Sequence, residues 1–148
     1  MSDYLKDPLI LRQIIMDHYQ YPHHHHLSED PDYHKIHMAS ESCIDDITVM
    51  AKIENGVLKD ICFDGVACTI STASTSIMTD LLRDKTLDEA KAIIQAYYDM
   101  IDLKGYNEEV LQEAVAFNQV GKQANRIKCA TIGFKAIEQA MEEANHHD

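Results

Sequence analysis

Three cysteines and one aspartate stand in surroundings that suit metal binding. Cys43 and Asp45 are two residues apart, in a stretch that joins two segments with the pattern of β-strands. Cys68 and Cys129 each lie where a helical pattern begins. Three thiolates and one carboxylate are enough ligands for a four-coordinate tetrahedral ion. The sequence therefore offers a candidate metal site made of Cys43, Asp45, Cys68 and Cys129.

Spacing alone does not settle this site. It is not the spacing of a zinc finger, and the chain has no Cys-x-x-Cys pair, so ordinary core cysteines remain an alternative. Position favours the site, because a loop and two helix starts can converge at one end of a small sheet. A cysteine at a helix N-terminus also faces unpaired N–H groups and the positive end of the helix dipole, which favour the thiolate. For Cys68 a buried capping role is an equal alternative.

The ligand types limit the chemistry of such a site. Four protein ligands would close a tetrahedral zinc and leave no water to activate, which disfavours hydrolysis. Three thiolates also suit an iron–sulfur cluster. The single carboxylate is a harder ligand, and it would make a cluster easier to hand on.

Other residues that could bind metals or ions have simpler interpretations. Cys62 falls on the strand face opposite the core pattern and is interpreted as a small strand residue. The run His23–His26 could bind a metal, but a solvated loop is the favoured interpretation. His34 and His37 lie near the first cysteine, and surface or core positions are favoured for both. Arg126 could hold Asp45 or stabilise a thiolate, with a surface position equally favoured.

Composition places the chain among acidic proteins of a reducing compartment. At 148 residues it is expected to form one domain, 1–148, with a core that needs no disulfide. The net charge of −12 argues against nucleic-acid backbones and anionic membranes as partners. Four cysteines, without a signal peptide or an apolar run of membrane length, indicate the cytoplasm.

The first half of the chain predicts a helix followed by three strands. Asp7 and Pro8 are typical of a helix start, and Leu11, Ile14, Ile15 and His18 share one face of a helix over residues 8–20. Strands are expected over 34–40, 46–53 and 57–64, the last two joined by an Asn55-Gly56 hairpin turn. The third strand is expected to turn Val57, Ile61 and Phe63 toward the core.

The second half predicts about four helices. The first begins at Cys68, and the second begins with the capping box Thr86-Leu87-Asp88-Glu89. A third is expected from Asn107 through Phe117, and a last one carries Ile127 to Met141, with Cys129 off the centre of its apolar stripe. Strands followed by helices indicate an α+β fold: a three-stranded antiparallel sheet, an N-terminal helix and a C-terminal set of about four helices.

The chain resembles the iron–sulfur cluster assembly scaffold family, the NifU amino-terminal/IscU/SufU group, over nearly its whole length. The resemblance lies in four ordered motifs: Ile15-Met16-Asp17-His18-Tyr19 with Pro22; Cys43-x-Asp45; Asp64-Gly65-x-x-Cys68-Thr69-Ile70-Ser71-Thr72-Ala73-Ser74; and Arg126-Ile127-Lys128-Cys129-Ala130-Thr131. Lys128, where the IscU branch has histidine, and the extra helical segment before it point to the SufU branch. The Leu-Pro-Pro-Val-Lys chaperone motif of IscU is absent. Ser42 and Ile44 flank Cys43 where the family usually has proline and glycine.

The resemblance implies that Cys43, Asp45, Cys68 and Cys129 bind zinc. It also implies that the protein accepts sulfur from a SufS-type cysteine desulfurase and passes it to downstream iron–sulfur assembly proteins. Because a metal-bound thiolate is a blunted nucleophile, the acceptor is expected to be the thiol that is easiest to release, which is Cys43 on its loop. Two alternatives remain: a scaffold for a transient [2Fe–2S] cluster on the same ligands, and a zinc-stabilised adaptor that activates the desulfurase by contact alone.

Overall fold

The structure is a computed structural model that describes residues 3–40 and 44–147. Its sheet has three antiparallel strands in the order β1-β2-β3: β1 (Tyr33–Ala39), β2 (Asp46–Glu54) and β3 (Val57–Val66). Asn55 and Gly56 both have positive φ, 53° and 73°, as a tight two-residue hairpin turn requires. The predicted three-stranded antiparallel sheet and the α+β class are confirmed.

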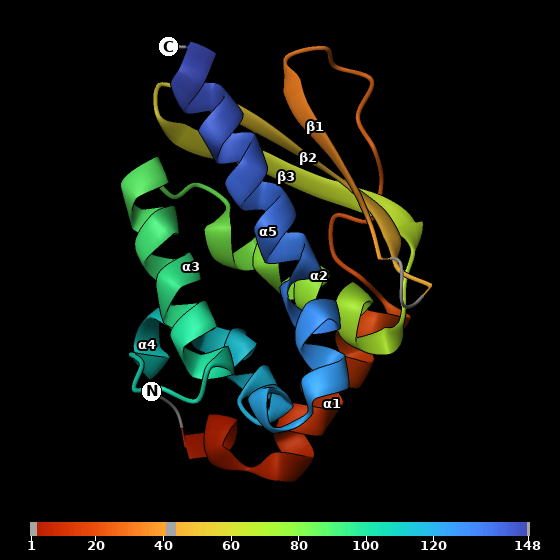
Figure 1. Cartoon of the computed structure of the whole chain (residues 1–148), viewed down its shortest axis with the longest axis vertical. Helices are drawn as coiled ribbons and strands as arrows, with labels where there is room; N and C mark the ends of the chain where they lie inside the picture. Colours follow the sequence, from red (N-terminus) through yellow and green to blue (C-terminus); the bar gives the residue numbers. More distant parts are fainter. Residues whose placement is uncertain (1–2, 41–43, 148) are drawn as a thin grey trace.

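The helices surround one face of this sheet (Figure 1). A short 3-10 turn, η1 (Asp3–Lys6), precedes α1 (Pro8–Gln20), whose N-cap Asp7 accepts a hydrogen bond from the Leu9 amide at 2.9 Å. After the sheet come α2 (Thr69–Leu82), α3 (Leu87–Ile101), α4 (Glu108–Leu111), the 3-10 segments η2 (Gln112–Phe117) and η3 (Val120–Lys122), and α5 (Ala124–His147). The predicted capping box forms in full, with Thr86 and Glu89 bonded to each other's backbone N–H groups.

Helix α5 is the centre of the molecule. It contacts α2, α3, β1 and β2, and it runs the length of the fold across the sheet (Figure 1). Tyr97 of α3 stacks on Phe134 of α5 with ring centroids 3.8 Å apart, and its hydroxyl donates to the Ala130 carbonyl at 2.7 Å. These contacts fix the start of α5, which carries Cys129.

Two local predictions are wrong. The helix predicted from Asn107 through Phe117 is interrupted, because Gln112 adopts φ 48° and the chain continues as a 3-10 segment. On β3 the buried residue is Leu58, whereas Val57 is only half-buried. A register irregularity between Lys52 and Ile53 pairs Ile53 with Leu58, and this shifts the alternation by one residue at that end.

Among the helices that the structure describes, none combines the length and the apolar character that crossing a lipid bilayer requires.

Candidate metal centre

Asp45 is a buried carboxylate, only 2% exposed, immediately before β2. One of its oxygens accepts a hydrogen bond from the Cys68 backbone N–H at 2.9 Å, and the other accepts one from the Ser71 hydroxyl. A buried charge is costly unless ion pairs or hydrogen bonds compensate it. Asp45 is thus already oriented by two donors toward the N-terminus of α2.

Cys68 is the N-cap of α2, as the sequence predicted for the start of this helix. Its sulfur accepts a hydrogen bond from the Ser71 backbone N–H at 3.4 Å and lies 3.3 Å from the Ser71 hydroxyl oxygen. The Ser71 N–H stabilises negative charge on the sulfur, and the helix dipole adds to that effect. Cys68 is half-buried, so its sulfur is held in place and still reachable.

Cys129 lies in the second turn of α5 and is 8% exposed. Burial, and after it the neighbouring Cys68 and Asp45, together raise the pKa of its thiol to about 12, which favours the neutral form. A cation among these groups would have the opposite effect, because it favours the thiolate.

A close approach of two strands brings Asp45 and Cys68 together. Gly65, opposite Ile47, has φ 136°, and a Cβ at this position would lie 2.2 Å from the Asp46 carbonyl oxygen. Only glycine fits there, so the end of β3 can pass tightly against the start of β2. Cys68 follows three residues later, beside Asp45.

The three described residues of the predicted site converge. Asp45, Cys68 and Cys129 each offer a ligand atom, and all three atoms lie within 4.8 Å of one another. Zinc–sulfur bonds of about 2.3 Å and zinc–oxygen bonds of about 2.0 Å need only a small contraction of this triangle. The donor set fits zinc. Cys43, the fourth predicted ligand, lies outside the described residues.

The other predicted candidates lie elsewhere. Cys62 is fully buried and its pKa is raised by burial, so it is a structural cysteine within β3. His34 lies 3.9 Å from Glu143, and His37 hydrogen-bonds Asp46 at 2.6 Å. Neither histidine belongs to the cysteine cluster among the described residues. Arg126 is exposed and lines a surface groove beside Thr69 and Ile70.

Sequence reasoning missed Ser71, whose hydroxyl contacts both Asp45 and Cys68. Its position three residues after an N-cap cysteine was the available signal, because that spacing places it over the cap.

The fold and the cysteine cluster agree with the iron–sulfur cluster assembly proteins of the IscU and SufU type that this chain is similar to. Residues 10–147 match the family of the NifU-like N terminal domain, and the chain belongs to this family. The resemblance predicted from the four motifs is confirmed.

Similar proteins come from both branches. The chain is 33% identical over 133 residues to the zinc-dependent sulfurtransferase SufU of Bacillus subtilis, covering 89% of each chain. It is 33% identical to the iron–sulfur cluster assembly scaffold protein IscU of Streptococcus pyogenes, covering 86% of this chain and 80% of the relative. The structure of FiSufU, a protein of the SUF system of Fervidobacterium islandicum, superposes with a TM-score of 0.82 at 28% identity, covering 87% of this chain and 94% of that one.

Proposed function

We propose that this protein is a zinc-dependent sulfur acceptor that works with a SufS-type cysteine desulfurase in iron–sulfur cluster assembly. The observation that carries the proposal is the convergence of Asp45, Cys68 and Cys129 within 4.8 Å, in a chain similar to SufU along 89% of its length. Cys43 supplies the fourth ligand, two residues before Asp45. Bound zinc would hold the thiols as thiolates at neutral pH.

Cys43 is the sulfur acceptor in this proposal because the other two thiols are held in place by the helices that carry them. Cys68 is fixed by the cap of α2, and Cys129 is buried in α5. Cys43 belongs to the segment between β1 and β2, whose ends are joined by a hydrogen bond from the Ser40 amide to the Asp45 carbonyl at 2.8 Å. This hydrogen bond holds the two ends of the connection together beside Asp45.

The transfer step is redox-neutral. The Cys43 thiolate attacks the terminal sulfur of a persulfide on the desulfurase, and a new sulfur–sulfur bond forms on Cys43. The sulfur–sulfur bond of the donor breaks, and the desulfurase cysteine leaves as a thiolate. The persulfide on Cys43 then passes its sulfur to downstream iron–sulfur assembly proteins.

Two exposed apolar side chains border the site and suit contact with a partner. Ile44 is 64% exposed and precedes Asp45, and Val66 is 66% exposed and pairs with Asp46 at the edge of the same tip. Large exposed apolar side chains beside a reactive group are typical of a protein–protein contact. We assign this tip as the face that meets the desulfurase.

Replacing the acceptor tests the proposal directly. Cys43→Ser should abolish sulfur transfer and stimulation of the desulfurase, while the variant remains folded by circular dichroism. Mass spectrometry of the wild type during turnover should find an added sulfur on Cys43. The control is Cys62→Ala, which lies outside the cluster and should retain transfer. Transfer that survives Cys43→Ser and is lost in Cys129→Ser would refute the assignment.

A second candidate function is a scaffold for a [2Fe–2S] cluster on the same ligands. The similarity to IscU of Streptococcus pyogenes favours it, as do the two thiols of the described cluster, since thiolates are the usual cluster ligands. Anaerobic reconstitution with iron and sulfide separates the two functions. A stable cluster, seen as visible absorption, that resists displacement by zinc would favour the scaffold, and preferential retention of zinc would favour the sulfur acceptor.

A further inference from the structure

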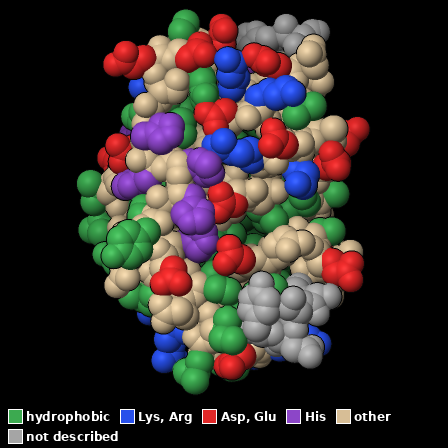
Figure 2. All heavy atoms as spheres, turned by 180° about the vertical axis from the view of Figure 1, so that it is seen from behind, with side chains coloured by type: hydrophobic (Ala, Val, Ile, Leu, Met, Phe, Trp, Pro, Cys, Tyr) green, Lys and Arg blue, Asp and Glu red, His purple; other side chains and the backbone are tan. Residues whose placement is uncertain are grey.

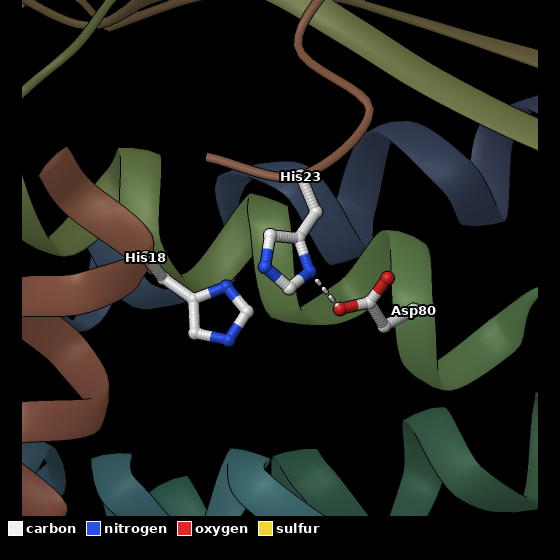
Figure 3. Close-up of side chains that lie close together, drawn as sticks. All are labelled: His18, His23 and Asp80. Carbon is white, nitrogen blue, oxygen red and sulfur yellow. Dashed lines mark hydrogen bonds and ion pairs between the residues drawn. The ribbon is translucent and has the colours of Figure 1, made fainter. Parts of the chain in front are cut away.

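A second group of metal-ligating side chains lies near the C-terminal end of α2, away from Cys68 at the N-cap. It comprises His18 of α1, His23 of the following turn and Asp80 of α2, and one ligand atom of each lies within 4.8 Å of the others (Figure 3). Figure 2 shows histidine side chains gathered on one face of the molecule beside acidic ones. The His23–His26 run is a solvent-exposed turn, as predicted, and within it His23 and His24 also contact Asp80 of α2.

His18 is the buried anchor of this group. It is 3% exposed, and its Nδ1 lies 2.7 Å from the Ser76 hydroxyl in the middle of α2. Histidines that bind metals almost always have their other ring nitrogen hydrogen-bonded, which fixes the ring and its tautomer. Ser76 provides that partner at Nδ1, while Nε2 faces Glu113. Glu113, 3.3 Å from this nitrogen, lies close enough to serve as a further ligand.

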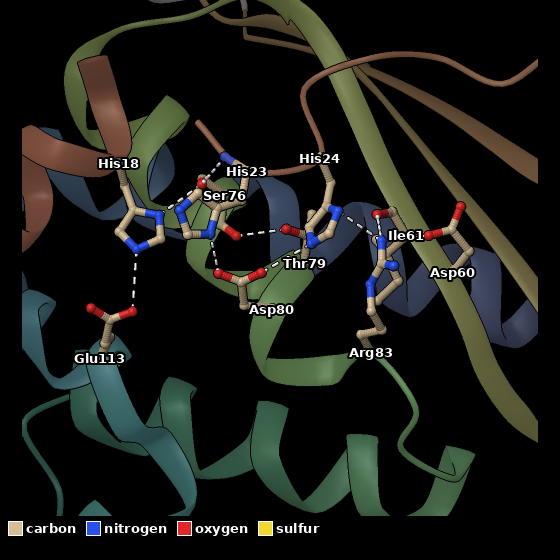
Figure 4. Close-up of polar contacts among 10 residues, drawn as sticks. All are labelled: His18, His23, His24, Asp60, Ile61, Ser76, Thr79, Asp80, Arg83 and Glu113. Carbon is tan, nitrogen blue, oxygen red and sulfur yellow. Dashed lines mark hydrogen bonds and ion pairs between the residues drawn. The ribbon is translucent and has the colours of Figure 1, made fainter. Parts of the chain in front are cut away.

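His23 is held at the same hydroxyl. Its backbone N–H donates to Ser76 Oγ at 2.8 Å, and its ring lies 4.4 Å from that of His18, centroid to centroid. Its Nδ1 contacts one oxygen of Asp80, while the other Asp80 oxygen lies 3.0 Å from Nε2 of His24 (Figure 4). One serine thus contacts the ring of His18 and the backbone of His23.

The backbone of this turn adopts an unfavourable conformation that brings the rings to α2. His24 has φ 54°, in the left-handed region that non-glycine residues rarely adopt. The His24 carbonyl accepts from the Phe63 amide at 3.0 Å, so the turn is also fastened to the edge of β3.

The charges around the group suit a cation. Asp80 and Glu113 are acidic, and the nearest positive side chain shown with them, Arg83, pairs with Asp60 and contacts His24 at Nδ1 (Figure 4). Two imidazoles and one or two carboxylates are the ligands of a borderline divalent ion such as Zn²⁺, bound at about 2.0–2.2 Å.

We propose that His18, His23 and Asp80 form a second metal site, with Glu113 as an additional ligand, which binds one Zn²⁺ or a similar divalent transition ion. The ion takes the place of the hydrogen bond between His23 Nδ1 and Asp80: a neutral His23 binds it through Nδ1 and carries its single proton on Nε2. The site has no thiol and ties the turn after α1 to the middle of α2. It does not depend on the sulfur-acceptor function proposed for the cysteine cluster.

Cobalt titration tests this site, because cobalt bound by nitrogen and oxygen gives visible d–d bands without the thiolate charge-transfer bands of a cysteine site. The full chain is first freed of metal, and the cysteine site is then filled with one equivalent of zinc. Further Co²⁺ should bind with one more equivalent and show the nitrogen–oxygen spectrum. His23→Ala and Asp80→Asn should each weaken this cobalt affinity by at least about tenfold.

His26→Ala is the matched control. It removes a histidine from the same run, and no side-chain contact to the group depends on it, so cobalt affinity should stay within about twofold of the wild type. Melting of the metal-free variants checks that each is folded; Asp80→Asn keeps the size and shape of the side chain but has one acceptor oxygen in place of two. Loss of affinity in His26→Ala equal to that in His23→Ala would mean diffuse polyhistidine binding and overturn the proposal. Absence of a second bound cobalt in the wild type would also overturn it.

Discussion

Helix α2 carries two clusters of metal-ligating side chains that differ in how they are built. At its N-terminus, Asp45 from the residue before β2 and Cys129 from α5 meet Cys68 at the cap. Three turns later, Asp80 meets His18 and His23 from the N-terminal part of the chain. The cysteine cluster draws on three distant parts of the chain, whereas the histidine cluster joins one helix to one neighbouring helix and turn.

The two clusters also differ in their exposure to solvent. Asp45 is 2% exposed and Cys129 is 8% exposed, while His23 and Asp80 have side chains that are 50% and 36% exposed. Water and salt weaken interactions at exposed charges, and buried groups escape most of this weakening. The cysteine cluster should therefore dominate the metal-dependent stability, and the histidine cluster should bind metal more weakly and exchange it faster.

The largest expected effect is the loss of thermal stability on removing metal. Zinc at a hundredfold excess over its dissociation constant adds about 2.7 kcal/mol, which in a chain of this size corresponds to roughly 5–10 °C of melting temperature. Calorimetry with and without a chelator should show this difference in the wild type. Cys129→Ser should abolish most of it, and His23→Ala should retain most of it. If His23→Ala abolishes most of the metal-dependent increase in melting temperature, the cysteine cluster is not the main source of that stability.

A packing change should disturb the cysteine cluster selectively. Gly133 of α5 lies against Thr75 of α2, and a Cβ there would lie 2.4 Å from the Thr75 hydroxyl oxygen. Gly133→Ala should cost about 1–3 kcal/mol, because overpacking moves α5, and with it Cys129, away from α2. Urea unfolding measures the cost. Gly105→Ala is the matched control, since nothing lies within 4 Å of its Cβ position.

The smallest expected effect is on the histidine cluster. Ser76→Ala removes the hydroxyl that contacts both His18 and the His23 amide, at a cost of about 1–2 kcal/mol. Cobalt affinity at the nitrogen–oxygen site should fall, while zinc binding at the cysteine site is unchanged. Ser74→Ala, whose hydroxyl contacts the Cys129 carbonyl instead, should leave the nitrogen–oxygen site unaffected. Equal effects of both variants at that site would show that the two clusters are coupled.

Sequence reasoning predicted the parts of the fold that short-range patterns determine. The Asn55-Gly56 turn, the Asp7 cap and the capping box at Thr86 follow from local backbone chemistry, and all three formed. The interruption at Gln112 was not predictable, because a positive φ at glutamine has no local signal. Leu58 rather than Val57 is buried because of a register irregularity in the partner strand. The alternation of one strand's own residues cannot reveal this.

The two clusters also differ in how far the sequence predicts them. The motifs around Cys68 and Cys129 named residues that the structure brings together, whereas the histidine cluster depends on which residues of α2 face the turn after α1. Periodicity places Ser76 and Asp80 on one side of a helix, since they are four residues apart. It does not say that His18 and His23 are the residues packed there, and only tertiary structure supplies that information.

X-ray absorption at the zinc edge, on protein loaded with one equivalent of zinc, tests the central claim most directly. We expect three sulfurs at about 2.3 Å from the zinc and one oxygen at about 2.0 Å, from Cys43, Cys68, Cys129 and Asp45. A first shell made of nitrogen and oxygen only, or with a single sulfur, would contradict it.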